Sequence, residues 1–175
     1  MTTTQTDRAG TPSRVRQVLL PPEARGLSTL SRIDYEDAFI VDAVGGRTAA
    51  QWTRAVFNDA PLAVRARLVS GWTGLGLNLA GPSSARRVLG WKVQRSSPDV
   101  MLLAADSILG LRAELLFRTE PRGLLFATLI QQNNAAARAL WARVIPTHER
   151  VVRSLLEHAA LREVGQAPAG EPGAR

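Results

Sequence analysis

Cysteine is absent from the 175 residues of this chain. Its absence excludes a disulfide-stabilised scaffold, thiol catalysis, cysteine-ligated zinc and iron–sulfur clusters. Histidine occurs only twice, as His148 and His158, so we expect no bound metal. Long apolar runs are missing too, because the longest uncharged stretch, between Arg67 and Arg86, contains four glycines. That stretch falls short of the ~20 apolar residues of a membrane-spanning helix, and no transmembrane segment is predicted.

Lysine is nearly absent, since Lys92 is the only one among 22 basic residues, and the formal net charge is +7. Nucleic-acid binders typically gather their arginines on one face or interleave them with stacking aromatics. Here the arginines alternate with apolar residues along the predicted strands and helices. We therefore predict no nucleic-acid partner, and the sequence carries no motif that requires a cofactor.

The length and a hydrophobic content of 45% are typical of one folded domain. The N-terminus is polar and lacks the apolar run of a secretory signal, which favours a soluble, cytoplasmic protein. We predict a flexible basic arm over residues 1–32, a folded domain over 33–162, and a disordered Gly/Pro/Ala tail over 163–175. The sequence leaves open whether the domain is a monomer or a homodimer.

Hydrophobic periodicity changes along the domain and predicts an α+β fold. Residues 111–118 alternate most clearly, with four apolar side chains facing one way and Arg112, Glu114 and Arg118 facing the other, toward solvent. Pro146 lies inside the last helix and is expected to kink it, because it removes a backbone donor. The predicted elements are a strand at 35–42, two short helices between 48 and 69, strands at 88–94, 100–105, 111–118 and 124–132, and a helix at 135–161.

The order of these elements resembles the helix-grip fold of the START and polyketide-cyclase superfamily, in which a curved antiparallel sheet wraps around a long C-terminal helix. The runs Leu89–Val93, Ser97–Asp99 and Ala127–Asn134, together with Trp141 and Pro146–His148, are similar to an uncharacterised START-like family common in actinobacteria. The resemblance covers about residues 34–160. It implies a cavity between sheet and helix that holds a lipid, a polyketide or a similar apolar molecule.

We accordingly expect non-catalytic binding of a small apolar ligand. The predicted walls of its site are Trp91, Leu111, Leu115, Phe117 and Thr128 from the sheet, and Trp141, Ile145 and His148 from the helix.

Two alternative functions remain open at this point, and so does the role of residues 68–84. The first is a cyclase- or dehydratase-like enzyme in which His148 acts as a base together with Asp106 or Glu114. The second is an interaction module without a ligand cavity. The glycines and apolar side chains of residues 68–84 suit a lid over the cavity, a transient contact with a membrane surface, or simple packing.

Overall fold

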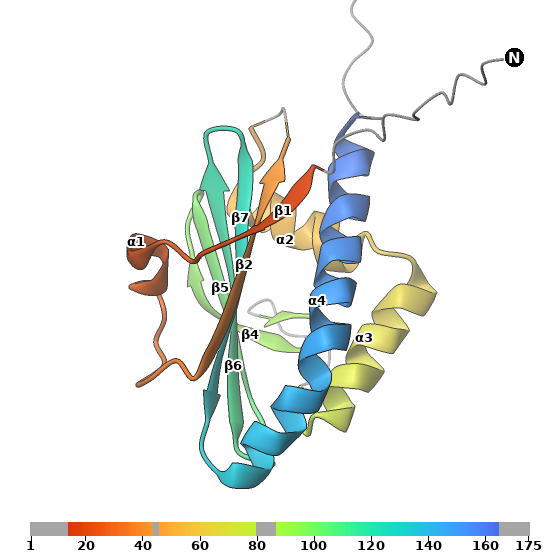
Figure 1. The fold of residues 1–175 in the computed structure, drawn as a ribbon. Helices are drawn as coiled ribbons and strands as arrows, with labels where there is room; N and C mark the ends of the chain where they lie inside the picture. The colour runs from red at the N-terminus through yellow and green to blue at the C-terminus, as the bar shows by residue number, and fades with distance from the viewer. Residues whose placement is uncertain (1–13, 44–45, 80–86, 165–175) are drawn as a thin grey trace, which may run out of the picture.

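A seven-stranded antiparallel sheet and a long C-terminal helix form the protein, in the helix-grip arrangement (Figure 1). The computed structural model describes residues 14–43, 46–79 and 87–164. Residues 1–13 of the predicted arm and residues 165–175 of the predicted tail lie outside these ranges, whereas residues 163–164 of that tail are helical. The strands run in the spatial order β1-β2-β7-β6-β5-β4-β3. Their bounds are β1 Val15–Val18, β2 Tyr35–Asp42, β3 Arg87–Val88, β4 Trp91–Ser96, β5 Val100–Asp106, β6 Leu111–Glu120 and β7 Gly123–Gln132.

The helices divide unequally between the two faces of the sheet. Figure 1 shows α4 and α3 on one side and α1 on the other. We call the α4 side the helix face and the α1 side the back face. The helical segments are α1 Pro22–Arg25, α2 Ala49–Thr53, the π-helix η1 Arg54–Asn58, α3 Leu62–Gly74 and α4 Ala135–Val164.

Two helix starts follow directly from local sequence. Thr48 caps α2, since its Oγ1 accepts a hydrogen bond from the Gln51 amide and its own amide donates to Gln51 Oε1. Asn134 caps α4 by accepting a hydrogen bond from the Ala137 amide at 2.7 Å. α4 continues through Pro146, and Figure 1 shows its axis bending within the half that contains this proline. The helix starts expected at about residues 48 and 135 are confirmed.

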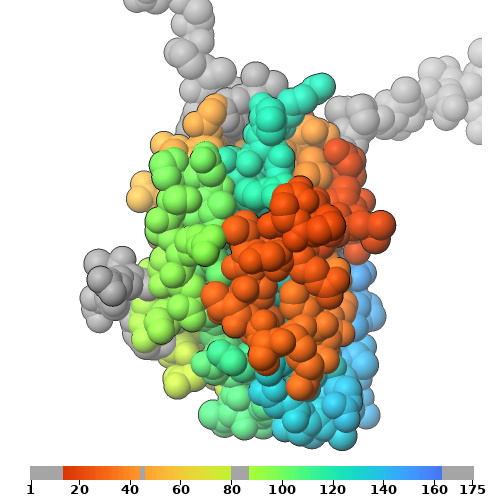
Figure 2. All heavy atoms as spheres, turned by 90° about the vertical axis from the view of Figure 1, so that its left-hand side faces the viewer, coloured from red at the N-terminus to blue at the C-terminus, as the bar shows by residue number. Residues whose placement is uncertain are grey.

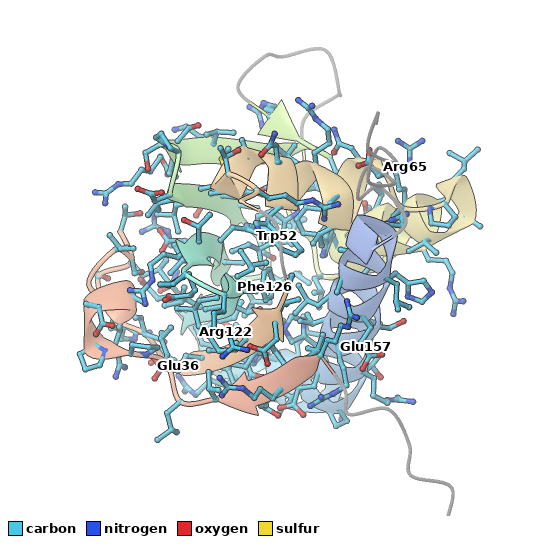
Figure 3. All side chains as sticks on the ribbon, turned by 90° about the horizontal axis from the view of Figure 1, so that it is seen from above. Glu36, Trp52, Arg65, Arg122, Phe126 and Glu157 are labelled. Atoms are coloured by element: carbon cyan, nitrogen blue, oxygen red, sulfur yellow. The ribbon has the colours of Figure 1, made fainter. Side chains whose placement is uncertain are left out.

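The predicted apolar face of β6 is the face that meets the helices. Leu111, Ala113, Leu115 and Phe117 are all buried in the main core between the sheet and α4. Seen from above in Figure 3, Trp52 and Phe126 lie in this interior, whereas Arg65 and Glu157 lie at its outside. Strand alternation therefore identified the inner wall of the sheet correctly.

The prediction of a flexible arm up to residue 32 is wrong for residues 14–32. Residues 15–18 form β1, which pairs with β2 at the edge of the sheet. The chain then crosses the back face, where Leu20, Leu27 and Leu30 pack against buried side chains of β5, β6 and β7. Figure 2 views this face and shows the segment, in red to orange, spread over it. Its apolar residues gain burial by covering a sheet face that is itself apolar.

Glu114 is a second correction on the same face. It was expected to face solvent, yet it is 1% exposed beneath the N-terminal segment. Its carboxylate accepts hydrogen bonds from Ser28 Oγ at 2.6 Å, from the Thr29 amide at 3.1 Å and from the Thr29 hydroxyl. These donors satisfy the charge that burial removes from water.

The strand predicted over 88–94 is interrupted. Leu89 and Gly90 both have positive φ angles, of 45° and 89°, and form a tight turn between β3 and β4. Glycine adopts this conformation without the steric cost that a side chain imposes. The turn leaves Trp91 as the first residue of β4, buried in the core.

None of the helices in the described ranges combines the length and the apolar content needed to cross a membrane.

Candidate functional site

A buried polar cluster interrupts the apolar helix face of the sheet. Nε2 of His148, on α4, lies 3.0 Å from Oδ2 of Asp37 and 3.1 Å from Oγ1 of Thr128. The Asp37 side chain has no exposed surface, and that of His148 is 16% exposed. A carboxylate and an imidazole are thus held in direct contact between sheet and helix.

Strand pairing places the partners of Asp37. β2 and β7 are neighbours, with Asp37 directly opposite Thr128. The Thr128 amide donates to Asp37 Oδ1 at 3.3 Å, and the Tyr35 hydroxyl donates to Asp37 Oδ2 at 2.8 Å. Together with His148, three groups therefore contact this one carboxylate, and they hold it in a fixed orientation.

Aromatic rings enclose the cluster. The ring centroid of Trp141 lies 5.3 Å from that of Tyr35 and 5.2 Å from that of His148. Burial raises the pKa of the Tyr35 hydroxyl above its ordinary value, and the negative charge of Asp37 raises it further. The indole nitrogen of Trp141 is buried and has no hydrogen-bond partner among the residues that the structure describes.

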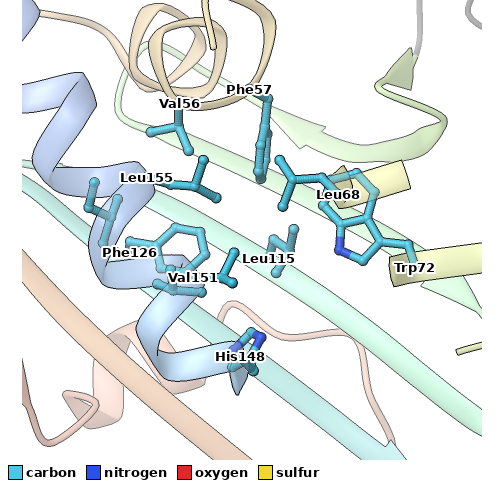
Figure 4. Close-up of a pocket in the computed structure, with 11 residues that line it drawn as sticks. Val56, Phe57, Leu68, Trp72, Leu115, Phe126, His148, Val151 and Leu155 are labelled. Carbon is cyan, nitrogen blue, oxygen red and sulfur yellow. The ribbon is translucent and has the colours of Figure 1, made fainter. Parts of the chain in front are cut away.

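An apolar cavity of about 40 Å³ lies beside this cluster, between α4, α3, η1 and the sheet. In Figure 4, His148 stands at one end of the cavity, and aliphatic and aromatic side chains gather around the remainder. Among the described residues that line it, only His148 and Trp72 carry polar side-chain atoms, which are the imidazole nitrogens of His148 and the indole N–H of Trp72. The lining residues are Val56, Phe57, Leu68, Trp72, Leu115, Phe126, His148, Val151, Val152, Leu155 and Leu156.

The cavity is small and its walls differ in how firmly they are held. A water molecule needs ~10–15 Å³ by this measure, whereas pockets for drug-sized ligands reach ~300–1,000 Å³. α4 and the sheet contribute many fully buried residues, but in α3 only Leu68 is buried. Leu62 and Val69 of α3 are 74% and 37% exposed. α3 is thus the wall with the least buried surface.

The predicted wall residues divide into two groups. Leu115 and His148 line the cavity, Thr128 contacts His148, and Trp141 packs on the His148 ring. The others fill the core or its border: Phe117 packs edge-on against Phe57 and Phe126, Trp91 packs against Trp72, Leu111 is buried, and Ile145 is half-buried.

Neither Asp106 nor Glu114, the two acidic residues expected to act with His148, contacts it. Asp106 is largely exposed and pairs with Arg112 at 2.9 Å, because β5 and β6 bring these two residues opposite each other at their ends. Glu114 lies on the back face of the sheet, since strand alternation points it away from Leu115. The prediction that His148 works with Asp106 or Glu114 is therefore wrong.

The acidic partner that sequence reasoning missed is Asp37. A signal for it was present, because Asp37 has the same parity along β2 as the core residues Phe39 and Val41. A charged residue at an inward-facing strand position requires a buried partner. The sequence does not show that this partner comes from a helix more than a hundred residues later.

In the ranges that the structure describes, no three acidic or histidine side chains come together in a way that could hold a metal ion. Of the segment 68–84, the residues up to 79 are described; Leu75, Leu77 and Leu79 pack against the main core, and residues 80–84 lie outside the described ranges.

Comparison of the chain with protein-family models, curated proteins and solved structures found no match. The likeness to a START-like family therefore stays a prediction, and the function is argued below from the site.

Proposed function

We propose that the protein binds a small apolar molecule between its sheet and α4, in the cavity beside His148. One observation carries the proposal: an apolar cavity has at its end a histidine that a buried carboxylate holds in place. Ligand sites in proteins commonly combine an apolar lining with a few fixed polar groups. Burial of the ligand would supply the binding free energy, at ~25 cal/mol per Å² of apolar surface.

Binding of anything larger than a few heavy atoms requires one wall to move. α3 is the wall that we expect to move, because Leu68 is its only buried residue. Its C-terminal end is anchored, since Ser107 Oγ donates to the Leu75 carbonyl at 2.6 Å and the Ile108 amide donates to the Gly76 carbonyl at 3.0 Å. We therefore expect α3 to swing about this end rather than to detach.

Two valines make a matched test of where the molecule binds. Val151 lines the cavity from α4 and is 39% exposed, while Val69 on α3 is 37% exposed and does not line it. Val151→Trp should fill the cavity with little strain, and Val69→Trp should place its indole in solvent. The two variants differ only in the site that the added ring occupies.

The measurement is fluorescence titration with 1-aminoanthracene, a neutral apolar probe, alongside organic extraction of the purified proteins and mass spectrometry. We expect wild type and Val69→Trp to bind the probe and to release the same co-purifying molecule, and Val151→Trp to do neither. Absence of probe binding to the wild type, or equal binding by the two variants, would contradict the proposal.

The contact between His148 and Asp37 also favours a second candidate, an enzyme in which the carboxylate orients the imidazole as a general base. The described residues of the cavity lining supply no second titratable group to complete such a site. Incubation of the extracted molecule with fresh protein distinguishes the two. A change in its mass or structure would favour the enzyme, and unchanged recovery favours the binding protein.

A further inference from the structure

We infer that the ligand is a neutral molecule that carries a hydroxyl group, an alcohol or a phenol, and that a carboxylate is rejected. This inference rests on the proposed function and names the chemical class that the same cavity selects. The inference follows from three points. Nε2 of His148 is hydrogen-bonded to Asp37, the nearby charges do not attract an anion, and removing water from the second ring nitrogen, Nδ1, has a cost in free energy.

The contact with Asp37 fixes the proton of His148. Nε2 lies 3.0 Å from a carboxylate oxygen, and two atoms that both carried only lone pairs would repel each other at that distance. Nε2 therefore carries a hydrogen and donates it toward Asp37, with Thr128 Oγ1 sharing the contact at 3.1 Å. In the neutral imidazole, Nδ1 is then an acceptor. Within the described residues, Nδ1 has no hydrogen-bond partner.

The charged groups that line the cavity or contact His148 give no attraction for an anion. No arginine or lysine is among the described residues that line the cavity. His148 contacts the carboxylate of Asp37. Glu149 is a second acidic residue nearby, and its negative charge adds to that of Asp37 in raising the pKa of the Tyr35 hydroxyl. If His148 is protonated, Asp37 neutralises it; if it is neutral, the site carries the charge of Asp37. The potential at this end is neutral or negative in both states.

Because Nε2 is turned toward Asp37 and Thr128 and His148 lines the cavity, Nδ1 is the ring nitrogen left to meet a ligand, and a ligand there would displace water from it. Leaving that acceptor buried and unpaired costs about 1–3 kcal/mol, so the ligand must replace the lost hydrogen bond. A hydroxyl donates to Nδ1 of the neutral imidazole and accepts from the protonated form, whereas an ether or a carbonyl only accepts. Of the hydroxyl, the ether and the carbonyl, only the hydroxyl suits His148 in both states.

Three probes of nearly equal size test the inference by displacement of 1-aminoanthracene from the wild-type protein near neutral pH. 1-Octanol has the hydroxyl, its isomer 1-methoxyheptane lacks the donor, and octanoate carries the negative charge. We expect 1-octanol to bind about ten-fold more tightly than the ether, the value of one hydrogen bond in a buried site, and octanoate to bind most weakly.

The two histidines provide the matched variants. His148→Phe should bring the affinities for 1-octanol and the ether to within about two-fold of each other, because the acceptor is gone. His158→Phe alters an exposed residue on the same helix and should leave the ten-fold difference intact. If His148→Phe retained that difference, or if octanoate bound as tightly as 1-octanol to the wild type, the inference would be overturned.

A measurement on the wild type covers the case in which His148→Phe does not fold. Nitrogen-15 NMR of the imidazoles reports which nitrogen carries the hydrogen, and His158→Phe assigns the two rings. We expect Nδ1 of His148 to be unprotonated in the free protein and to shift with 1-octanol but not with the ether. A protonated Nδ1 paired with an unprotonated Nε2 contradicts the inference. If none of the probes, 1-aminoanthracene included, binds, the proposed function itself fails.

Discussion

Among the described residues, each face of the sheet buries one carboxylate, and the two carboxylates have different hydrogen-bond partners. On the back face, the donors to Glu114 among the described residues are Ser28 and Thr29, which belong to the segment that covers it. On the helix face, Asp37 holds His148, and His148 lines a cavity. Both carboxylates are nearly inaccessible to solvent. Burial of an acidic residue therefore does not by itself indicate a functional site.

Glu114 and Asp37 differ in the chemistry of their hydrogen-bond partners. The donors on Glu114 are an amide and two hydroxyls of Ser28 and Thr29, and Ser28 Oγ in turn accepts a hydrogen bond from the Leu30 amide at 3.2 Å, so this network stays within the N-terminal segment. Imidazole has two nitrogens, and when one binds the carboxylate the other faces away from it. Asp37 can therefore influence a bound molecule through His148, while Glu114 can only fasten the N-terminal segment to the sheet.

The largest effect is expected from Glu114→Ala. The substitution leaves the Ser28 and Thr29 donors buried without an acceptor, so we expect the free energy of unfolding to fall by about 4 kcal/mol. Chemical denaturation measures the loss, and Glu114→Gln, which retains one acceptor, should lose about half as much. Probe binding by the folded fraction should stay at the wild-type level; a loss of binding would show that the two faces are coupled.

Asp37→Asn is the corresponding change on the helix face. Its side chain retains one acceptor oxygen for Tyr35, Thr128 and His148, and we expect a loss of about 2 kcal/mol. Unlike Glu114→Gln, it should also reduce the preference for 1-octanol over 1-methoxyheptane, because the proton of His148 is no longer fixed on Nε2. The comparison between the faces breaks down if both amide variants change ligand preference equally.

Tyr35→Phe should have a smaller effect and expose a pH dependence. In the unfolded chain the hydroxyl ionises near its ordinary pKa of 10.0, while in the folded protein burial and Asp37 raise that pKa. Above pH 10 the unfolded state therefore releases a proton that the folded state retains, and stability falls as the pH rises. Below pH 10 the Tyr35 hydroxyl is protonated in both the folded and the unfolded state, so the pKa shift does not make stability depend on pH there.

Tyr35 is the only tyrosine in the chain, so tyrosinate absorbance follows it directly. We expect its titration in the folded protein to be displaced above the titration in denaturant. The phenylalanine variant should lose about 1 kcal/mol at neutral pH with the Asp37 hydrogen bond, and it should lack this part of the alkaline destabilisation. Coincident titrations in the two states would contradict the buried contact.

The smallest effect is expected from Asp106→Ala. Its carboxylate is largely exposed and pairs with Arg112 across the ends of β5 and β6. Exposed ion pairs contribute ~0–1 kcal/mol, so the free energy of unfolding should change by less than about 0.5 kcal/mol. A larger change in thermal or chemical denaturation would give this surface pair a structural role.

Local patterns predicted much of the fold. The alternation of 111–118 identified the inner wall, the short helices after residue 48 were expected, and the long C-terminal helix was placed with its proline. Each of these signals is contained within a few neighbouring residues, which is why the sequence displays it. The segment 14–32 carries no such period, because its apolar residues are spaced to cover a sheet rather than to form one long element.

The sequence by itself determined the α+β class, the order of the elements from β2 onward and the side of the sheet that is apolar, since these depend on local periodicity. Only the tertiary structure decided that Asp37 meets His148 and that Glu114 lies beneath Ser28 and Thr29. Those contacts join residues about 85 to 110 positions apart, and no local pattern encodes which buried polar groups will find each other. Packing of the helix and of the N-terminal segment on opposite faces chose the pairs, because each buried charge requires a partner on the face where it lies.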